Sequence, residues 1–437
     1  MKVYKFGGTS VGLPERMQSI ARLITEDSEP KIVVLSALSG TTNSLVNIGE
    51  ALNSRKQDVA HLLINDIEKH YLNFIQALYS ADESRQKAIA TINRIFSEIR
   101  ALGHIPDFNA GNNKSLLAYG EILSTHLFHY YLNEIQIKNE LLNSLDFMRI
   151  NSEGEPDLQY VSEQLAHSIN VDTRLYIAQG FICRNAYGQT DNLKRGGSDY
   201  TASLIGAALK VDEIQIWTDI DGMHNNDPRI VKGTQPIEEL TFDEAAELAY
   251  FGAKILHPAT ILPAQKYGIP VRLKSTIDPN ASGTLIGINS DKADVKAIAA
   301  KDDITAIKIK SSRMLLAYGF LKNIFEIFGQ YKTSIDMITT SEVAVSLTID
   351  NTQNIDEIVG ALEKFGTVTI DKNQSIICIV GNMLSEKKGL LNKIFKNLDE
   401  IPIRMVSYGG SRSNISLLVD TKYKNETLTQ LNRLFTS

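Results

Sequence analysis

The sequence contains very few cysteines and no cluster of cysteines and histidines. Only Cys183 and Cys378 occur among its 437 residues, and each lies in an apolar, strand-like segment far from the other. A disulfide framework or a structural zinc site needs several such residues at short spacing. We therefore expect two buried free thiols in a protein of the reducing cytoplasm, and no metal bound by protein side chains.

Long apolar runs and a surplus of basic residues are also missing. No stretch reaches the roughly 18 consecutive apolar residues of a membrane-spanning helix. Gly7 and Gly8 interrupt the first apolar stretch, which argues against a signal peptide. The 51 acidic and 45 basic residues give a net charge of -6. Binding to nucleic acid or to an anionic membrane usually shows as a basic surplus, so we expect neither partner.

Residues 1–290 alternate between short apolar runs and helix-like segments. The apolar runs that predict strands are Lys2–Phe6, Lys31–Ser36, Leu175–Cys183, Glu213–Thr218 and Pro270–Lys274. Helical patterns occur at Pro14–Thr25, Tyr200–Leu209 and Asp243–Ala249, and helix-forming residues dominate Leu45–Glu98, which predicts a helical insertion. This alternation predicts an α/β domain whose mainly parallel sheet is sandwiched between helices.

A weak internal repeat fills the chain from about Asp294. Its first copy, residues 303–372, reads strand, helix, strand, strand, helix, strand, with the second strand at Ser334–Ile338. This is the ferredoxin-like βαββαβ order. The second copy, residues 373–437, stops one strand short. We expect Val295–Ala300, within residues 294–302, to fill the exposed edge that this leaves. The first copy would then be inserted within the second; the alternative is that Val295–Ala300 is a linker with some β character.

Near the N-terminus, a strand leads directly into a glycine pair in the string Lys5-Phe6-Gly7-Gly8-Thr9-Ser10-Val11-Gly12. Without Cβ atoms, Gly7 and Gly8 let the backbone approach a ligand, and the N–H groups there can form an anion-binding concavity. Lys5 can supply positive charge to oxygens that gain negative charge during group transfer. The lysine precedes the glycines, so this is not a Walker A loop. A glycine pair alone would indicate only a turn.

A second glycine turn opens a helix in the string Lys194-Arg195-Gly196-Gly197-Ser198-Asp199-Tyr200-Thr201-Ala202. The N-terminus of a helix favours anions, and the planar fork of Arg195 suits a carboxylate. Two interpretations of Asp199 stay open: it is a charge partner for the helix dipole, or it is part of a ligand site.

Together, these two motifs resemble the signatures of aspartokinases within the amino-acid kinase superfamily. The resemblance extends over essentially the whole chain, through the segments Ser36–Asn43, Gly120–Ser124, Gly180–Phe181, Trp217–Gly222, Asp227–Arg229 and Phe251–Ala259. It implies transfer of the γ-phosphate of ATP to the β-carboxylate of L-aspartate, giving 4-phospho-L-aspartate. Mg2+ would be held mainly by the nucleotide phosphates. This reaction opens lysine, threonine and methionine biosynthesis.

The resemblance also implies roles for single residues. Lys5 would stabilise the transferring oxygens and Asp199 would organise the site, either by contacting the metal or by orienting Lys5. Glu121 would hold the substrate ammonium. The residues implied to bind aspartate are Ser36, Thr42, Glu121, Phe181, Arg195 and Ser198. Those implied to bind the nucleotide are Lys5, Gly7, Gly8, Thr9, Ser10, Thr218, Asp219, His224, Arg229 and Lys254.

The C-terminal repeat resembles the paired ACT domains of lysine-inhibited aspartokinases. The implied effector contacts are Met314, Gly319, Phe320, Leu321, Ser334, Asp336, Thr340, Ser341, Glu342 and Val343. Asp336 and Glu342 offer anionic partners to a cationic effector, which favours lysine over threonine. ACT domains of this family pair across a two-fold axis, which implies a homodimer, or a tetramer built from it.

Three positions depart from the family pattern. Tyr119 stands where many relatives have a histidine, His224 begins a segment that usually starts with a tyrosine, and Ala317 replaces a hydroxyl residue of the effector turn. Base packing at His224 and the strength of lysine inhibition are therefore open. Two alternatives compete with aspartate kinase: another kinase of the superfamily, or a catalytically silent amino-acid sensor. Because no GxGxxG fingerprint occurs, we expect no fused homoserine dehydrogenase.

Overall fold

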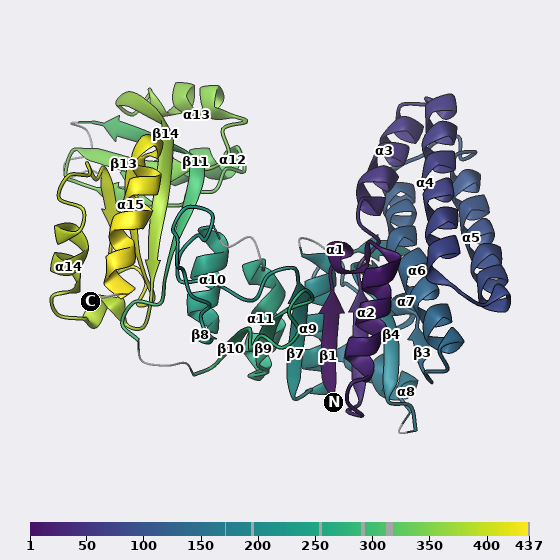
Figure 1. Cartoon of the computed structure of the whole chain (residues 1–437). Helices are drawn as coiled ribbons and strands as arrows, with labels where there is room; N and C mark the ends of the chain where they lie inside the picture. Colours follow the sequence, from purple (N-terminus) through teal and green to yellow (C-terminus); the bar gives the residue numbers. More distant parts are fainter. Residues whose placement is uncertain (171, 194–195, 253–255, 290–292, 312–317, 436–437) are drawn as a thin grey trace. The chain divides into compact units, whose positions relative to one another are not determined.

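Figure 1 shows a computed structural model of the chain, which describes residues 1–437 except 171, 194–195, 253–255, 290–292, 312–317 and 436–437. The chain divides into two compact units. Unit 1 comprises Met1–Met223, Glu238–Phe242 and Ile255–Ser290, and unit 2 comprises His224–Ile237, Asp243–Lys254 and Asp291–Ser437. In the described part of the chain, no helix is long and apolar enough to cross a membrane.

An eight-stranded sheet forms the centre of unit 1, with the strand order β3-β4-β2-β1-β7-β9-β10-β8. Neighbouring strands from β3 to β9 run parallel, and β10 runs antiparallel to β9. The strands are β1 Lys2–Phe6, β2 Lys31–Leu35, β3 Glu140–Leu142, β4 Leu175–Gln179, β7 Glu213–Thr218, β8 Glu239–Thr241, β9 Val271–Ser275 and β10 Thr284–Gly287. The predicted mainly parallel sheet is confirmed.

Helices cover both faces of this sheet (Figure 1). On one face, Tyr4, Phe6 and Trp217 belong to a core shared with α2 (Pro14–Thr25) and α6 (Ala110–Glu134). Lys5 points to the other face, because side chains alternate along a strand. There α9 (Gly197–Leu209) packs on β1, β2 and β7, and α8 (Leu158–Ser168) and α11 (Pro258–Tyr267) pack on α9. The charged end of β1 therefore faces the first turn of α9.

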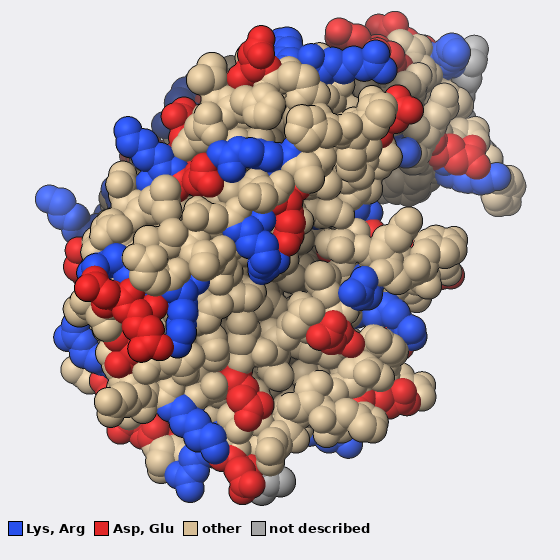
Figure 2. All heavy atoms as spheres, turned by 90° about the vertical axis from the view of Figure 1, so that its right-hand side faces the viewer, with Lys and Arg blue, Asp and Glu red and all other residues tan. Residues whose placement is uncertain are grey.

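The predicted helical insertion consists of α3 (Thr41–Asn53), α4 (Gln57–Leu78) and α5 (Asp82–Leu102), which pack with α6. Apolar residues recur every three or four positions along α4, and this spacing produces the stripe that the bundle buries. Figure 2 shows the side of unit 1 that carries this insertion: lysine and arginine are intermixed there with aspartate and glutamate. This face thus offers no large surface of a single charge to a polyanion.

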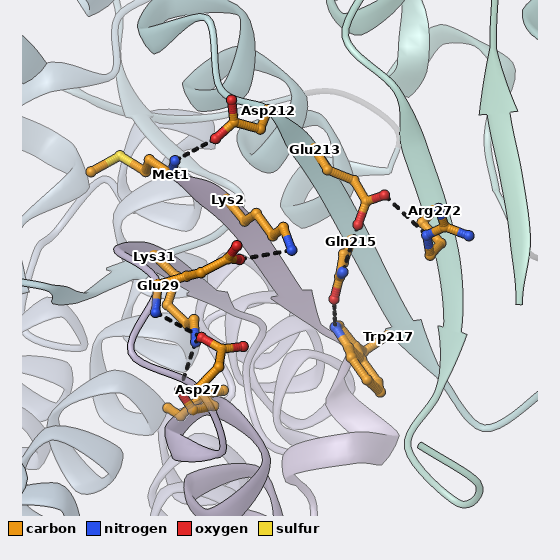
Figure 3. A network of polar contacts seen from close by, with 11 residues as sticks. Met1, Lys2, Asp27, Glu29, Lys31, Asp212, Glu213, Gln215, Trp217 and Arg272 are labelled. Carbon is orange, nitrogen blue, oxygen red and sulfur yellow. Dashed lines mark hydrogen bonds and ion pairs between the residues drawn. The ribbon is translucent and has the colours of Figure 1, made fainter. Parts of the chain in front are cut away.

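Ion pairs join the N-terminal ends of the central strands (Figure 3). The ammonium of Lys31, which is 1% exposed, lies 2.6 Å from Asp27 and donates to the carbonyl oxygen of Ile24 at 3.0 Å. Arg272 Nε donates to Glu213 at 3.0 Å, which links β9 to β7. Each of these charges has an opposite charge beside it. They lie at the N-terminal edge of the sheet, opposite the loops that follow the C-terminal ends of the strands. We regard them as structural.

Unit 2 contains a six-stranded sheet in the order β12-β13-β11-β14-β16-β15. Its strands are β11 Ala297–Lys310, β12 Ile338–Thr340, β13 Ala344–Ile349, β14 Thr367–Val380, β15 Met405–Ser407 and β16 Asn414–Asp420. The first part of β11 pairs with the last part of β14, and β13 and β16 extend the sheet on opposite sides of this central pair. The result is two four-stranded halves that share two long strands.

Each half of the sheet has its own pair of helices and its own apolar core. α12 (Phe320–Gln330) and α13 (Ile355–Leu362) pack on the half that contains β13. α14 (Leu390–Lys396) and α15 (Lys424–Leu431) pack on the half that contains β16. This is the helix and strand order of two ferredoxin-like units, as the repeat predicts.

Four predicted strand segments differ from the structure. Leu175–Cys183 is not one strand: β4 ends at Gln179, and β5 (Ile182–Arg184) follows Phe181, whose φ of 66° turns the chain. The strand predicted at Ser334–Ile338 is wrong, because the regular ladder begins only at Ile338. The two segments predicted on either side of residue 302 form the single strand β11, because Asp303, with φ of 60°, absorbs a register shift without ending the ladder.

Candidate active site

Four parallel strands of unit 1 end at the same edge of the sheet. Phe6 at the end of β1 lies opposite Leu35 of β2 and Trp217 of β7, and Leu35 lies opposite Gln179 of β4. The loops that follow these strands contain most of the predicted site residues of unit 1. The C-terminal edge of a parallel sheet is the usual ligand-binding edge of an α/β fold.

The glycine turn after β1 packs closely against the loop after β2. A Cβ atom on Gly8 would lie 3.0 Å from the carbonyl oxygen of Ala37, so a larger residue would push the two loops apart. Gly8 begins the short helix α1 (Gly8–Val11), and Gly7 is its N-cap. The sequence thus uses glycine here to bring two loops together as well as to admit a ligand.

Lys5 and Asp199 form an ion pair across this edge. Lys5 Nζ lies 2.7 Å from Asp199 Oδ1, and the two side chains are 13% and 15% exposed. Lys5 comes from β1 and Asp199 from the first turn of α9. The carboxylate holds the Lys5 ammonium in one position, and the remaining exposure leaves the ammonium accessible to a ligand. The resemblance implies that Asp199 either contacts the metal or orients Lys5, and this ion pair fits the second role.

The first turn of α9 also meets the loops after β2 and β4. Ser36 Oγ donates to Ser198 Oγ at 2.9 Å, and the N–H of Phe181 donates to Thr201 Oγ1 at 2.9 Å. A Cβ atom on Gly180 would lie 2.3 Å from Ser198 Oγ, so this close approach requires glycine. Three of the predicted substrate residues, Ser36, Phe181 and Ser198, are therefore neighbours in the fold.

Glu121 is a buried carboxylate behind the loop after β2. It lies in α6 and is 5% exposed, and its Oε1 accepts a hydrogen bond from the N–H of Ala37 at 3.3 Å. Burial raises the pKa of Glu121 from 4.5 to about 8, although the backbone hydrogen bond opposes this shift. An acid with so high a pKa holds its proton at neutral pH until a positive group arrives.

The predicted nucleotide residues of unit 1 follow the ends of β1 and β7. Thr218 Oγ1 donates to Asp219 Oδ1 at 3.1 Å, and Asp219 is exposed. Thr9 is exposed, whereas Ser10 is buried, and its hydroxyl has no hydrogen-bond partner among the described residues. Thr218 and Asp219 lie one strand away from the Lys5 end of β1.

The other predicted nucleotide and substrate residues are elsewhere. Arg195 and Lys254 lie outside the described residues. His224 and Arg229 belong to unit 2, where His224 Nδ1 lies 3.0 Å from Thr234 Oγ1. Arg229 forms a two-pronged ion pair with Asp227, at 2.9 and 2.7 Å, and its side chain is 85% exposed.

The described effector residues of unit 2 belong to the start of α12 and to the segment that leads through β12 into β13. Gly319 caps α12 in the left-handed conformation, and Phe320 and Leu321 begin that helix. Ser341, Glu342 and Val343 form the tight turn between β12 and β13, closed by a hydrogen bond from Ser341 N to Ala344 O at 2.8 Å. Thr340 and Glu342 are exposed, and Met314 lies outside the described residues.

Asp336 already has cationic and hydroxyl partners within unit 2. Its side chain is fully buried; Oδ1 lies 2.9 Å from Lys301 Nζ and accepts from the Tyr250 hydroxyl at 2.7 Å. Lys301 also pairs with Asp350 at 2.9 Å, and its ammonium lies 4.3 Å from the centre of the Tyr250 ring. The loop Ser334–Val343 is therefore tied to α10 (Phe242–Tyr250) and β11.

No role was predicted from the sequence for two residues that hold the loops at the C-terminal edge of the unit 1 sheet. Ser124 Oγ donates to the carbonyl oxygen of Ser36 at 2.8 Å, and Thr201 holds Phe181 as described above. A signal existed for both: Ser124 follows Glu121 by three residues on one helix face, and Thr201 belongs to the second glycine motif.

Among the described residues, no group of three or more acidic, histidine or cysteine side chains could hold a metal ion.

Comparison with known proteins gives matches over both units. Residues 1–275 match a family model described as the amino acid kinase family, and residues 377–435 match one described as an ACT domain. Lysine-sensitive aspartokinase 3 of Escherichia coli K12 is 35% identical over 431 residues, which cover 95% of each chain.

Solved structures give the same result. The crystal structure of E. coli aspartokinase III in complex with aspartate and ADP, in the R-state, has a TM-score of 0.84 at 33% identity and covers 100% of both chains. The T-state complex of E. coli aspartokinase III with lysine and aspartate also has a TM-score of 0.84, at 34% identity, and covers 100% of this chain and 99% of that one.

Proposed function

The chain belongs to the aspartokinase family, and we propose that the edge around Lys5 is where it transfers a phosphoryl group from ATP to L-aspartate. It is an aspartate kinase with allosteric regulation through its ACT domain. The observation that carries the proposed site is the Lys5–Asp199 ion pair, which stands at a sheet edge beside Ser36, Ser198 and Glu121.

In this proposal, Glu121 recognises the ammonium of aspartate. A carboxyl group that is almost completely buried, with a pKa of about 8, carries a proton at neutral pH before a ligand binds. An ammonium beside it favours the charged form. Binding of aspartate then releases the proton of Glu121, and the resulting ion pair lies in a site from which water is largely excluded. Ser36, Thr42, Phe181, Arg195 and Ser198 complete the proposed substrate contacts.

The chemistry needs no strong general base. An oxygen of the β-carboxylate, which is already anionic, forms a bond to the γ-phosphorus, and the bond from that phosphorus to the bridging oxygen of ADP breaks. Catalysis of such a transfer consists mainly of positioning and charge neutralisation. Lys5 supplies the positive charge to the transferring oxygens, and Asp199 keeps the ammonium in place.

The nucleotide would occupy the turn after β1 and the end of β7. E. coli aspartokinase III binds ADP, and we infer the same class of ligand here, at Gly7, Gly8, Thr9, Ser10, Thr218 and Asp219. Bound Mg2+ would neutralise phosphate charge. We infer that it is held mainly by the phosphates. The roles of His224, Arg229 and Lys254 stay predictions.

We infer two interleaved ACT units, residues 303–372 and residues 294–302 with 373–437. The pairing of Ala297–Lys301 with Ile376–Val380 supports this division, because the upstream segment occupies the edge that the second repeat lacks. We also infer a homodimer formed through the ACT units, from which a tetramer could be built.

Lysine is the effector that we propose. E. coli aspartokinase III forms a T-state complex with lysine and aspartate. In unit 2, Glu342 is an exposed carboxylate at the tip of a turn, available to a cationic ligand. Dose–response curves with lysine and threonine test this assignment: inhibition by lysine at lower concentration supports it, and inhibition by threonine alone would remove it.

The substrate is tested by ADP release from the purified chain with L-aspartate, glutamate, N-acetylglutamate, carbamate or UMP as acceptor. We expect turnover with aspartate to exceed that with the others by orders of magnitude. Preference for another acceptor would contradict the proposed pocket, and absence of turnover with all five would favour the silent sensor. The cytoplasmic location stays a prediction.

A further inference from the structure

A tyrosine of the helical insertion reaches the substrate side of unit 1. Tyr71 lies in α4 and is fully buried. Its hydroxyl lies 3.0 Å from Thr41 Oγ1, and its ring makes an edge contact with Phe96 of α5, with ring centres 6.1 Å apart. The packing of the ring fixes the hydroxyl, so the bond to Thr41 has a defined position.

Thr41 connects this hydroxyl to the proposed aspartate pocket. It is the first residue of α3 and is buried, whereas the next residue, Thr42, is exposed toward solvent. Thr41 also packs against α6: a Cβ atom on Gly120 would lie 3.4 Å from Thr41 Cγ2, and Gly120 immediately precedes Glu121. Thr41 thus lies beside one proposed substrate contact, Thr42 of its own helix, and packs next to a second, Glu121 of α6.

The surroundings make this hydrogen bond sensitive to loss. Burial raises the pKa of Tyr71 well above its usual value, although the hydrogen bond to Thr41 opposes this shift, so the hydroxyl stays neutral. Removing the hydroxyl would leave Thr41 Oγ1 buried without this partner. An unpaired buried hydroxyl is costly enough that the side chain is expected to turn and shift the first turn of α3.

We propose that Tyr71 is a positioning residue for aspartate: through Thr41, it fixes Thr42 relative to Glu121. This inference rests on the proposed aspartate pocket. It gives α4 a part in substrate affinity, although no residue of α4 or α5 was assigned to the site.

Tyr71→Phe tests the inference, because it removes only the hydroxyl. We expect the KM for aspartate to rise about three- to tenfold, while the KM for ATP stays within about twofold and kcat changes little. Tyr79→Phe is the matched control: Tyr79 follows the end of α4, is 2% exposed, and donates its hydroxyl to Leu127 O at 2.6 Å. It should lower the melting temperature without a selective effect on aspartate.

Thr41 provides the second half of the test. Thr41→Val should reproduce the effect of Tyr71→Phe, Thr41→Ser should restore near-normal KM, and the Tyr71→Phe/Thr41→Val pair should be no worse than either change alone. If Tyr71→Phe does not fold, as judged by circular dichroism, the two Thr41 variants decide. Equal behaviour of the Tyr71 and Tyr79 variants, or a normal aspartate KM in Thr41→Val, overturns the inference.

Glu121→Gln in the same assays separates this inference from the proposed function. If Glu121→Gln raises the aspartate KM while the Tyr71 and Thr41 variants do not, only the positioning role fails. If Glu121→Gln also leaves the aspartate KM unchanged, the aspartate pocket itself is misplaced.

Discussion

The two predicted ligand regions, one in each unit, use their charged residues differently. In unit 1, Lys5 and Asp199 come from different elements and meet where a ligand can still reach them. In unit 2, the predicted effector carboxylate Asp336 is fully buried and already paired with Lys301. The same kind of ion pair therefore forms the proposed reactive centre in one unit and an internal link in the other.

This difference fits what each unit has to do. Phosphoryl transfer needs a charge that is held in place before the substrate arrives. Regulation needs an effector loop that is mechanically connected to other elements, because coupling is a free-energy difference between two arrangements of the protein. Asp336 makes such a connection to Tyr250 and Lys301, and we propose that the exposed Glu342 meets the effector.

The largest effect is expected from Lys5→Ala. Removing a preorganised charge from the transferring oxygens should lower kcat by roughly two orders of magnitude or more, with aspartate binding largely intact. Single-turnover phosphoryl transfer and aspartate titration of the same variant measure the two properties separately. A near-normal kcat would show that the comparison is wrong and that Lys5 is a structural partner like Lys301.

Glu121→Gln should raise the aspartate KM by about tenfold to a hundredfold, because a buried charge-assisted contact is lost. Wild-type affinity for aspartate should rise as the pH increases toward about 8, since Glu121 must lose its proton on binding. The variant should lack this part of the pH dependence, which binding titrations between pH 6 and pH 8 can measure.

The same carboxyl group predicts a stability difference in the absence of ligand. The folded-state pKa of Glu121 is raised, so the folded protein keeps its proton after the unfolded chain has lost it. Wild-type stability is therefore fully present below the unfolded pKa and falls by a few kcal/mol in order of magnitude as the pH rises to about 8. Glu121→Gln should not show this loss. Parallel pH profiles of the two melting temperatures would contradict the assigned protonation.

A smaller effect is expected in the regulatory unit. Glu342→Ala should raise the lysine concentration for half-inhibition by about tenfold, as most of a coupling of roughly 1–3 kcal/mol is lost, with kcat unchanged. Tyr250→Phe, which removes the bond to Asp336 and keeps the ring over Lys301, should desensitise less, by about two- to fivefold.

Tyr408→Phe is the control for this pair, since the Tyr408 hydroxyl donates to Ser385 O at 2.9 Å elsewhere in unit 2. It should leave inhibition unchanged. Desensitisation by Tyr408→Phe as strong as by Tyr250→Phe would show that the Asp336 link has no special part in regulation.

The sequence predicts what is local. A strand that runs into Gly7 and Gly8, and a helix that opens at Gly197, are short patterns, and parallel strands bring the loops after them to one edge. The sheet of unit 1 and the ferredoxin-like order of unit 2 follow from such patterns. β11 was harder to predict, because whether Val295–Ala300 joins the first strand of the repeat copy 303–372 depends on one turn of the backbone at Asp303.

The sequence does not indicate how deeply a polar side chain is buried or which distant residues it contacts. Nothing near Glu121 in the chain indicates its burial, which depends on the loop at Ala37. In the sequence, Asp336 has no recognisable partner, because Lys301 and Tyr250 are distant along the chain. From the sequence, Tyr71 would be predicted to be only a buried position of a helix, since its hydrogen-bond partner Thr41 belongs to another element.

The most direct test of the account is a double-mutant cycle on kcat with Lys5→Ala, Asp199→Asn and the combined variant. If Asp199 acts by holding the Lys5 ammonium at 2.7 Å, each single change should reduce kcat strongly. The combined variant should then be no slower than Lys5→Ala, because Asp199 has nothing left to orient. A combined loss equal to the product of the two single losses would contradict the account, since it would mean that Lys5 and Asp199 act independently.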